Sequence, residues 1–439
     1  MAPPLRIGLI GFGNIGSGVV RTLQENRDLL DARCPRRLEL RRVADVDLER
    51  ERPVAVDRSL LTTEALEVIA DPDIDVVVEL IGGLDPARMF VETAIRAGKH
   101  VVTANKALLA DCGAEILALA ADKGVRVLFE AAVGGGIPVV RVLTECLAAN
   151  RITRVEGILN GTCNYILTQM SLHGISYQEA LVGAQELGYA EPDPTADVEG
   201  MDAAHKIAIL ASLAFEKDIR YEDVYREGIT KLSPNDLHVV NLHEHGFIKH
   251  FAVAEMDPDG AVGVSVRPMI LPEDDPLAGV DGVLNAVRLD GDPVGTVVLT
   301  GPGAGPGPTS SAVLSDLMWL SRLAEKSAPK AFLTIPIGRK PRKKTGRAYE
   351  GYWLGLSVRK RGLAGKIAEI LVRSAIVIRE IEEIPLQVFE DRDNPPYSIR
   401  VSILNASEEN VKKAVEELRA AGFADTDDVR ALPIASFYE

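Results

Sequence analysis

The chain has 439 residues, of which 46% are hydrophobic and 26% charged, and it carries a net charge of −15. The length predicts two to four globular domains, and the acidic charge argues against nucleic acid or anionic lipid as a partner, because like charges repel. Neither a signal-peptide pattern nor a run of about twenty apolar residues is present, so we expect a cytoplasmic protein without membrane contact.

Residues 6–130 alternate short β-branched runs with segments of helical periodicity. This alternation is typical of a parallel sheet with crossover helices, which we place in a first domain at residues 1–135. The strands are expected at 6–10, 38–44, 75–80, 100–103 and 125–129, and the helices at 14–24, 86–97 and 115–122.

The first strand runs directly into the glycine-rich motif Gly11-Phe12-Gly13-Asn14-Ile15-Gly16, inside which a helix begins. Such a motif alone is often only a turn. A strand before it and a helix after it favour a loop that holds the pyrophosphate of NAD or NADP, because glycine lets the backbone approach the phosphates.

The end of the second strand bears on the choice between these cofactors. Asp45 would bond the ribose of NAD and repel the 2′-phosphate of NADP. Arg41, Arg42 and Arg50 lie close enough in the chain to argue the opposite case. The cofactor preference therefore stays open.

From residue 137 the pattern changes to longer helices and antiparallel-looking strands, which indicates an α+β domain at residues 136–335. Its glycine- and proline-rich segment 301–308 is typical of a tight turn beside a ligand and precedes a helix at 311–323. A basic linker at 335–348 then leads to a small third domain at 350–439, with the order strand, helix, strand, strand, helix, strand. The strands of the second domain are expected at 153–159, 247–256, 262–269, 285–289 and 294–300.

Residues 184–206 form an acidic segment, AQELGYAEPDPTADVEGMDAAHK, that leads into a helix. An exposed acidic loop is its simplest interpretation. Asp202 and Lys206 lie four residues apart on one helical face, so they can form an ion pair. Most such pairs are surface salt bridges worth a few tenths of a kcal/mol, so spacing alone leaves their role open.

The same segment resembles the signature of homoserine dehydrogenases in the order and spacing of its residues. The matching positions are Ala184, Gly188, Tyr189, Asp193, Pro194, Asp197, Gly200, Asp202 and Lys206. Segments 103–106, 130–138, 157–167 and 301–305 are also similar to that family, so the resemblance covers nearly the whole chain. It implies a monofunctional enzyme for the reversible NAD(P)H-dependent reduction of L-aspartate 4-semialdehyde to L-homoserine, a step of threonine, methionine and isoleucine biosynthesis.

The resemblance also implies catalytic roles. A buried lysine is suited to donate a proton to a developing alkoxide near neutral pH. The family's proton donor corresponds to Lys206. Lys106, just past the strand at 100–103, is implied to contact substrate and nicotinamide, and the sequence leaves open whether it shares the proton transfer. Glu191 and Asp202 correspond to the positions that bind the substrate's ammonium group.

Further family positions concern the cofactor and a metal ion. Gly188 and Gly303 match places where the second domain approaches the cofactor, and Thr103 matches a place near the nicotinamide ribose. The family often holds a structural sodium ion, and a glutamate with three backbone carbonyls is a set of hard oxygen ligands. The corresponding ligands here are Glu130, Val133, Gly135 and Ile137.

Segments 351–358 and 362–371 resemble an ACT domain, a module that pairs with itself and binds amino-acid effectors such as threonine. The usual acidic-x-Pro-Gly turn is replaced here by Arg359-Lys360-Arg361-Gly362. This replacement leaves open whether an effector binds, and oligomerisation could be the module's only task. By resemblance we expect a homodimer or homotetramer.

Two alternatives remain. Another Rossmann oxidoreductase using thioester chemistry would need a cysteine with a histidine partner, which we cannot identify. A non-catalytic sensor of NAD(P) or amino acids would have no need for Lys106, Asp202 and Lys206.

The cysteines, all outside CxxC motifs, are expected to be free thiols, and the histidines, outside any HExxH motif, are assigned no role. These residues are Cys34, Cys112, Cys146, Cys163, His205, His238, His243, His245 and His250.

Overall fold

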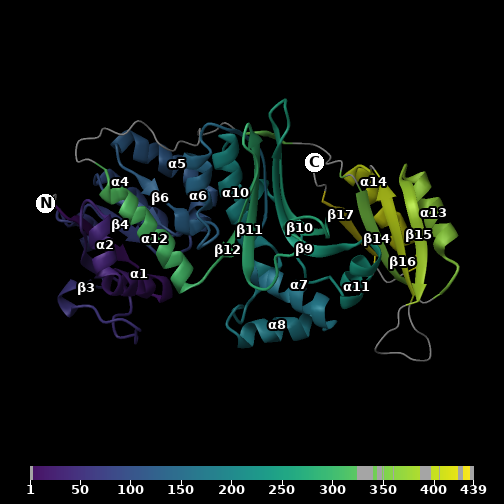
Figure 1. Ribbon diagram of the computed structural model, residues 1–439, viewed down its shortest axis with the longest axis horizontal. Helices are drawn as coiled ribbons and strands as arrows, with labels where there is room; N and C mark the ends of the chain where they lie inside the picture. Colours follow the sequence, from purple (N-terminus) through teal and green to yellow (C-terminus); the bar gives the residue numbers. More distant parts are fainter. Residues whose placement is uncertain are drawn as a thin grey trace.

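The computed structural model describes residues 3–323, 340–343, 349, 351–358, 360–385, 397–404, 406–423 and 429–435. The molecule is elongated, with the N-terminal sheet at one end, a long antiparallel sheet in the middle and a small domain at the other end (Figure 1). Among these residues, no helix combines the length and the apolar character needed to cross a membrane.

The N-terminal sheet has six strands in the order β3-β2-β1-β4-β5-β6, and all of its pairings are parallel. The predicted parallel sheet is therefore confirmed. The order reverses between β1 and β4, so the carboxyl ends of these strands border the crevice where such sheets bind ligands. The strands are β1 (Leu5–Ile10), β2 (Leu38–Ala44), β3 (Leu61–Thr62), β4 (Val76–Glu79), β5 (His100–Thr103) and β6 (Val127–Leu128).

The helices of this sheet include α5, which is longer than predicted. It begins at Lys106 because the side chain of Asn105 accepts a hydrogen bond from the amide of Leu108, 3.1 Å away. It ends at Gly124, whose φ of 68° is left-handed. The helices are α1 (Asn14–Glu25), α2 (Arg27–Arg33), α3 (Ala65–Ala70), α4 (Ala87–Arg96) and α5 (Lys106–Lys123), with a 3-10 turn at Arg58–Leu60.

The second sheet is antiparallel along β12-β11-β7-β9-β10, as predicted. Helix α10 packs against β7, β9 and β10 of this sheet and also against α5. The strands are β7 (Arg151–Ile158), β9 (Gly246–Met256), β10 (Ala261–Pro272), β11 (Leu284–Asp292) and β12 (Gly295–Pro302), and the short β8 (Tyr225–Arg226) pairs with β10. The helices are α6 (Val139–Arg141), α7 (Gly161–His173), α8 (Tyr177–Glu186), α9 (Thr195–Val198), α10 (Met201–Phe215) and α11 (Pro234–His243), with shorter helical turns at Glu130–Ala132, Val142–Cys146 and Tyr221–Asp223.

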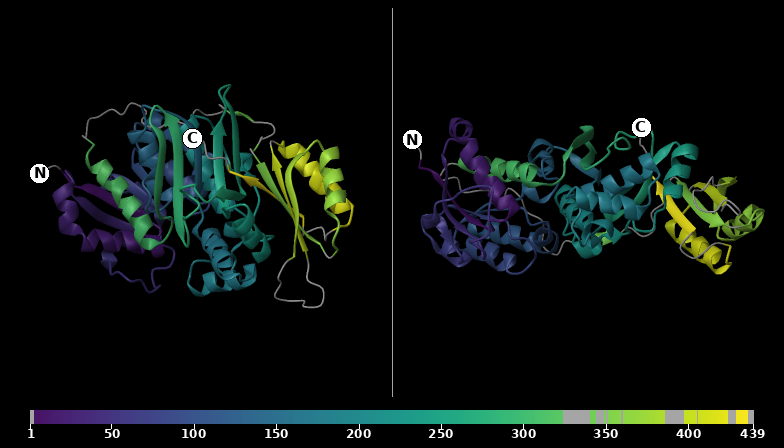
Figure 2. Two further views of the ribbon diagram at one scale, coloured as in Figure 1. Left: turned by 45° about the vertical axis from the view of Figure 1, so that its right-hand side comes forward. Right: turned by 90° about the horizontal axis from the view of Figure 1, so that it is seen from below.

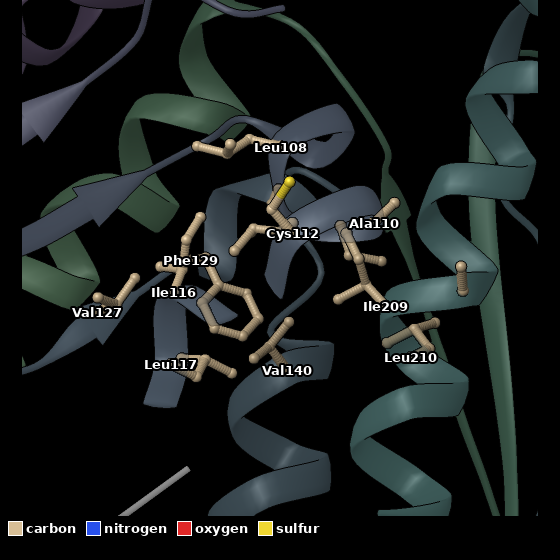
Figure 3. Close-up of a cluster of buried hydrophobic side chains, with 14 of the residues drawn as sticks. Leu108, Ala110, Cys112, Ile116, Leu117, Val127, Phe129, Val140, Ile209 and Leu210 are labelled. Atoms are coloured by element: carbon tan, nitrogen blue, oxygen red, sulfur yellow. The ribbon is translucent and has the colours of Figure 1, made fainter. Parts of the chain in front are cut away.

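One apolar cluster joins the two sheets (Figure 3). Leu108 and Ile116 of α5 belong to the same buried group as Phe129 and as Ile209 and Leu210 of α10. Burial of these side chains holds α5 against α10, because separating the helices would expose them to water. The amino-terminal halves of both helices carry the predicted catalytic residues.

Helix α12 (Pro306–Ser321) returns to the N-terminal sheet and packs against α1, as Figure 1 shows. Before it, the carbonyl of Pro302 accepts a hydrogen bond of 2.9 Å from the amide of Gly136. A helix from the sequence range 136–335 thus completes the N-terminal layer. The boundaries of the first two domains remain predictions.

The C-terminal region has the predicted order, with a sheet β17-β14-β16-β15. Its edge strand β17 also pairs with β10, and the amide of Ala435 donates to the carbonyl of Ile270 at 2.8 Å. The second and third sheets are therefore continuous, which the sequence did not predict; both views of Figure 2 show the C-terminal strands beside the central sheet. The basic linker lies mostly outside the described residues. The elements are β13 (Arg342–Lys343), which pairs with β10, and β14 (Gly351–Val358), α13 (Ala364–Arg373), β15 (Val377–Pro385), β16 (Tyr397–Leu404), α14 (Glu408–Ala420) and β17 (Val429–Ile434).

Candidate active site

The glycine-rich loop joins β1 to α1 at the carboxyl edge of the parallel sheet. Gly11 has a φ of 99°, which makes the sharp turn, and a Cβ on Gly16 would lie 2.2 Å from the carbonyl oxygen of Gly11. A Cβ on Gly13 would meet no atom within 4 Å. Gly11 and Gly16 are thus required by the fold, whereas Gly13 leaves open space where backbone amides at a helix start can approach a phosphate.

Asp45, just after the end of β2, is hydrogen-bonded to this loop. Asp45 accepts a hydrogen bond of 2.6 Å from the amide of Phe12. Arg52, whose side chain is 8% exposed, lies 3.4 Å from Asp45 and donates to the carbonyl of Phe12 at 2.7 Å. Its guanidinium stacks over the Phe12 ring. Sequence reasoning considered other arginines and missed Arg52, because only folding of the loop after β2 brings it to the glycine motif.

Two residues at the ends of β4 and β5 form a buried pair. The hydroxyl of Thr103 donates to Glu79 at 2.6 Å and accepts from the amide of Asn105 at 3.0 Å. The other carboxylate oxygen of Glu79 accepts from the amides of Ile81 and Gly82. Glu79 was not predicted, although an acid that ends a buried parallel strand is a recognisable signal. This network holds the start of α5, and therefore Lys106, at the edge of the sheet.

Lys206, Asp202 and Lys106 form one cluster. Nζ of Lys206 lies 2.7 Å from Oδ2 of Asp202 and 2.7 Å from the carbonyl oxygen of Leu159. Nζ of Lys106 lies 2.9 Å from Oδ1 of Asp202. The side chains of Lys206 and Asp202 are 8% and 9% exposed, whereas that of Lys106 is 42% exposed. The predicted pair on α10 is therefore a buried ion pair, and the surface salt bridge that spacing had left possible is excluded.

The charges in this cluster act on one another strongly. Burial alone would raise the pKa of Asp202, but the two lysine ammonium groups outweigh it and hold that pKa well below its usual range. Asp202 in turn raises the pKa of Lys106. The carboxylate stays ionised between the two lysine side chains, whose N–H groups can donate to an oxygen atom that gains negative charge.

Asn160 connects this cluster to α7. Its side-chain amide donates to Asp202 at 2.9 Å and to Asp197 at 2.7 Å, and its side-chain oxygen accepts from the amide of Cys163 at 2.8 Å. Burial and the charge of Asp202 raise the pKa of Asp197. Sequence reasoning gave Asn160 and Asp197 no role, although an asparagine before a helix is a strong N-cap signal.

Three further predicted site residues are Glu191, Gly188 and Gly303. Glu191 is exposed, and its negative charge contributes to the raised pKa of Lys106. Gly188 is left-handed, with a φ of 73°. A Cβ on Gly303 would lie 2.1 Å from the amide carbon of Asn285, a side chain buried to 1% exposure whose polar atoms have no partner among the described residues. Asn285 is a further residue that sequence reasoning missed.

The predicted sodium ligands lie between residues 130 and 137, in the 3-10 turn Glu130–Ala132 and the loop that follows it. The two carboxylate oxygens of Glu130 accept hydrogen bonds from the amides of Val140 and Arg141, at 2.8 and 2.9 Å, and burial raises the pKa of Glu130. The loop carries left-handed glycines, with φ of 73° at Gly134 and 50° at Gly135. A carboxylate and backbone carbonyl oxygens are the donor types that a hard cation takes.

The histidines show no such grouping. The ring of His250 is buried and lies 3.1 Å from the carbonyl oxygen of Glu227. Over the described part of the chain, no three histidine, cysteine or acidic side chains gather as a metal site would require. The four cysteines are free thiols, as expected.

A parallel sheet whose glycine loop is open to a phosphate, next to a buried cluster of two lysines and a carboxylate, defines a nicotinamide-dependent oxidoreductase. Comparison with known families agrees with this class. The family described as "Homoserine dehydrogenase, NAD binding domain" matches residues 11–130, and the family "Homoserine dehydrogenase" matches residues 138–318.

Individual relatives agree over most of the chain. It is 40% identical to a homoserine dehydrogenase of Pseudomonas aeruginosa over 95% of this chain and 96% of that protein, and 39% identical to one of Bacillus subtilis over 87% and 88%. The crystal structure of a homoserine dehydrogenase from Thiobacillus denitrificans superposes with a TM-score of 0.88 at 37% identity, covering 99% of both chains. The chain belongs to the homoserine dehydrogenase family. It is an oxidoreductase of this family, and the comparisons do not favour the alternative of a non-catalytic sensor.

Proposed function

We propose that this chain reversibly reduces L-aspartate 4-semialdehyde to L-homoserine and that Lys206 donates the proton. The observation that carries this assignment is the buried Lys206–Asp202–Lys106 cluster. When bound, the reduced nicotinamide supplies the hydride. The remaining requirement is a proton and a positive field at the carbonyl oxygen, and both are available from the cluster.

The hydrogen bonds of Lys206 support its role. An ammonium group has three donors. Two are committed, one to Asp202 and one to the carbonyl of Leu159. These two bonds fix the direction of the third N–H, which is free to reach a substrate oxygen. A buried, oriented donor of this kind loses little entropy when the substrate binds.

Lys106 is better suited to an electrostatic role. Asp202 raises its pKa, which makes it a weaker acid than an isolated lysine. Its side chain is the most exposed of the three, so it can contact substrate and nicotinamide. We therefore assign Lys106 to binding and charge stabilisation, and the proton transfer to Lys206.

The substrate's ammonium group needs a carboxylate. Asp202 already accepts from Lys206 and Asn160 at Oδ2 and from Lys106 at Oδ1, so it has room for at most one further donor. Glu191 is exposed and acts electrostatically on Lys106. We assign the principal ammonium contact to Glu191, with Asp202 orienting the two lysines and completing the acidic side of the pocket.

The cofactor proposal is that both NADH and NADPH are used. Asp45 is held by the Phe12 amide at the place where a ribose hydroxyl would bind, and Arg52 beside it offers a positive charge to a 2′-phosphate. A structural relative, a hyperthermophilic archaeal homoserine dehydrogenase with 25% identity and a TM-score of 0.59, was solved in complex with NADPH. We assign Gly188 and Gly303 to cofactor contact from the second sheet, and Thr103 to support of the nicotinamide end.

Further proposals rest on the resemblance to the family. Glu130 with the carbonyls of Val133, Gly135 and Ile137 would hold a structural sodium ion. The enzyme would assemble as a homodimer or homotetramer and act in the cytoplasm in threonine, methionine and isoleucine biosynthesis. The βαββαβ order of the C-terminal domain supports an ACT-like module.

The test is oxidation of NADPH and NADH with L-aspartate 4-semialdehyde, and the reverse reaction with L-homoserine. Lys206→Ala should lower turnover by roughly two to four orders of magnitude while cofactor affinity stays near normal. Lys217→Ala, just past the end of α10, is the matched control and should leave turnover unchanged. Near wild-type turnover of Lys206→Ala would remove Lys206 from the mechanism, and an inactive, nucleotide-binding wild type would contradict the proposed reaction.

A further inference from the structure

Glu79 ends β4 at the carboxyl edge of the parallel sheet and is completely buried. One of its carboxylate oxygens accepts from the hydroxyl of Thr103 at 2.6 Å, and the other accepts from the amides of Ile81 and Gly82 at 2.9 and 3.2 Å. All three partners are donors, which is the set that an ionised carboxylate requires. Glu79 therefore places a negative charge one hydrogen bond below an exposed loop, residues 81–83.

This charge forms no ion pair within the part of the chain that the structure describes. Seven acidic side chains are buried there, and five of them pair with a lysine or an arginine, namely Glu156, Asp202, Asp218, Asp275 and Asp316. The other two are Glu130, which we assign to a sodium ion, and Glu79. Lys106, which directly follows Asn105 of the same network, pairs with Asp202 instead. Among the described residues, Glu79 is thus the buried acid to which no positive partner has been assigned.

The order of the strands indicates which part of a dinucleotide lies beside Glu79. A sheet of this order binds one nucleotide on each side of the point where the strand order reverses. The glycine loop after β1 and Asp45 after β2 mark the adenosine side, so β4 and β5, which end in Glu79 and Thr103, form the nicotinamide side. The side chain of Ile81 is 38% exposed and lies against Gly11 of the glycine loop. The loop above Glu79 therefore borders the crevice.

Hydride transfer adds a positive charge on this side of the crevice. The hydride leaves with its electron pair for the carbonyl carbon, and the nicotinamide ring, neutral before, then carries one positive charge. In the proposed reaction the carbonyl oxygen takes its proton from Lys206. A fixed negative charge in a protein interior stabilises such a positive charge, because the surroundings screen it less than water does. We propose that Glu79 is the counter-charge of the oxidised nicotinamide ring, so that it favours the binding of NAD(P)+ over that of NAD(P)H.

The same charge acts in opposite senses on the two directions of the reaction. Reduction of the aldehyde starts from a neutral ring that becomes positive, so Glu79 lowers its barrier. Oxidation of the alcohol starts from the positive ring, which Glu79 stabilises, so its barrier is raised. A residue that only supports the loop would affect both directions alike. This consequence rests on the proposed function, whereas the binding preference rests only on the nicotinamide cofactor.

The binding preference is tested without substrate, by isothermal titration calorimetry of the full chain with NAD+, NADH, NADP+ and NADPH. Glu79→Gln keeps the size of the side chain and removes its charge. It should raise the Kd of the oxidised cofactor about tenfold more than that of the reduced one, the effect expected of one partly screened charge. Asp45→Asn is the matched control, because it removes a charge on the adenosine side, where the oxidised and reduced cofactors are identical. It should weaken both members of a pair equally.

A second variant does not depend on the folding of Glu79→Gln. Ile81→Glu adds a carboxylate on the exposed loop, so it should shift the ratio of the two Kd values in the opposite sense, and Ile81→Gln is its uncharged control. Equal weakening of both redox forms by Glu79→Gln would overturn the proposal and leave Glu79 as a support of the loop. The same ratio in Ile81→Glu and Ile81→Gln would also overturn it, because the ring would then lie away from this loop.

The effect on direction is tested in single-turnover reactions at saturating substrate, followed by the absorbance of the reduced nicotinamide. Glu79→Gln should slow the reduction of the semialdehyde and speed the oxidation of L-homoserine, so that the ratio of the two rate constants falls about tenfold. Similar slowing of both directions would overturn the electrostatic role. A chain that binds the cofactors with the expected preference but reduces no semialdehyde would keep the role of Glu79 in binding and reject the proposed function.

Discussion

Two buried ion clusters of this protein differ in a way that identifies which one is a catalytic site. Between β7 and β11, Arg288 lies 2.9 Å from Asp275 and also pairs with Glu156, and all three side chains are at most 5% exposed. On α10, Asp202 pairs with two lysines, of which Lys106 is 42% exposed.

The first cluster is closed and the second is open. Arg154 also pairs with Glu156, so two cations meet two carboxylates between the strands. In the α10 cluster Lys106 is 42% exposed, and an N–H of Lys206 has no partner in the cluster. Burial of charge is therefore no sign of function by itself. A partly exposed ion pair and an uncommitted hydrogen-bond donor are the distinguishing features of the α10 cluster.

The largest expected effect on stability is at the closed cluster. Arg288→Met should lower the free energy of unfolding by about 3–5 kcal/mol, because Glu156 and Asp275 would remain buried with one cation fewer. Urea unfolding followed by circular dichroism measures this loss. Arg154→Met, which leaves the Asp275 pair intact, should cost less. An equal or larger loss for Lys206→Met would contradict the contrast between the clusters.

Loss of the central carboxylate should affect activity more than folding. Asp202→Asn leaves two ammonium groups without a negative charge between them, so turnover should fall roughly a hundredfold. The depressed pKa of Asp202 also predicts that its contribution to stability is fully present above its unfolded pKa and is lost as pH falls through the folded one. Acid unfolding of Asp202→Asn should lack this loss. If Asp202→Asn lost stability at low pH in the same way as the wild type, the ion pair would contribute nothing to the stability of the folded state.

Asn160 has two roles that can be tested separately: it caps helix α7, and it donates a hydrogen bond to Asp202. Asn160→Ala should cost about 1 kcal/mol of stability through the lost N-cap. It should also lower kcat roughly tenfold, because Asp202 loses a hydrogen bond. Ser176, which caps α8 with a capping box, provides the control. Ser176→Ala should show a similar loss of stability and normal kcat, and equal kinetic effects would reduce Asn160 to a structural cap.

A further expected effect, confined to one cofactor, concerns Arg52. Arg52→Gln removes the positive charge beside Asp45, so the KM for NADPH should rise about tenfold while that for NADH changes little. Arg41→Gln is the comparison, because Arg41 pairs with Glu39 at 2.9 Å. A parallel rise for both cofactors would mean that Arg52 only supports the loop.

The dependence of stability on pH in the alkaline range provides a test of Lys106. Its raised pKa means that its contribution to stability is fully present below the unfolded pKa and is lost as pH rises through the folded one. Lys106→Met should remove this alkaline loss and raise the KM for the semialdehyde. A wild-type alkaline profile in Lys106→Met would argue that the pair with Asp202 does not persist in solution.

Sequence by itself determined the features that depend on neighbours in the chain. The strand, glycine loop and helix at residues 6–24 are local signals, and the alternation of strands and helices is sufficient for a parallel sheet. Asp202 and Lys206 are four residues apart, so helix geometry alone places them on one face. The resemblance rests on the same kind of short-range spacing, which is why it could assign residues before any contact was known.

Tertiary structure alone decided what those residues meet. The pairing of Lys106 with Asp202 depends on α5 packing against α10, and the bond from Lys206 to the carbonyl of Leu159 depends on the end of β7. The position of Arg52 and the joining of β17 to β10 likewise depend on long-range folding. Such contacts depend on how apolar faces and strand edges pack against each other across the molecule. This packing cannot be predicted from the spacing of residues along the chain.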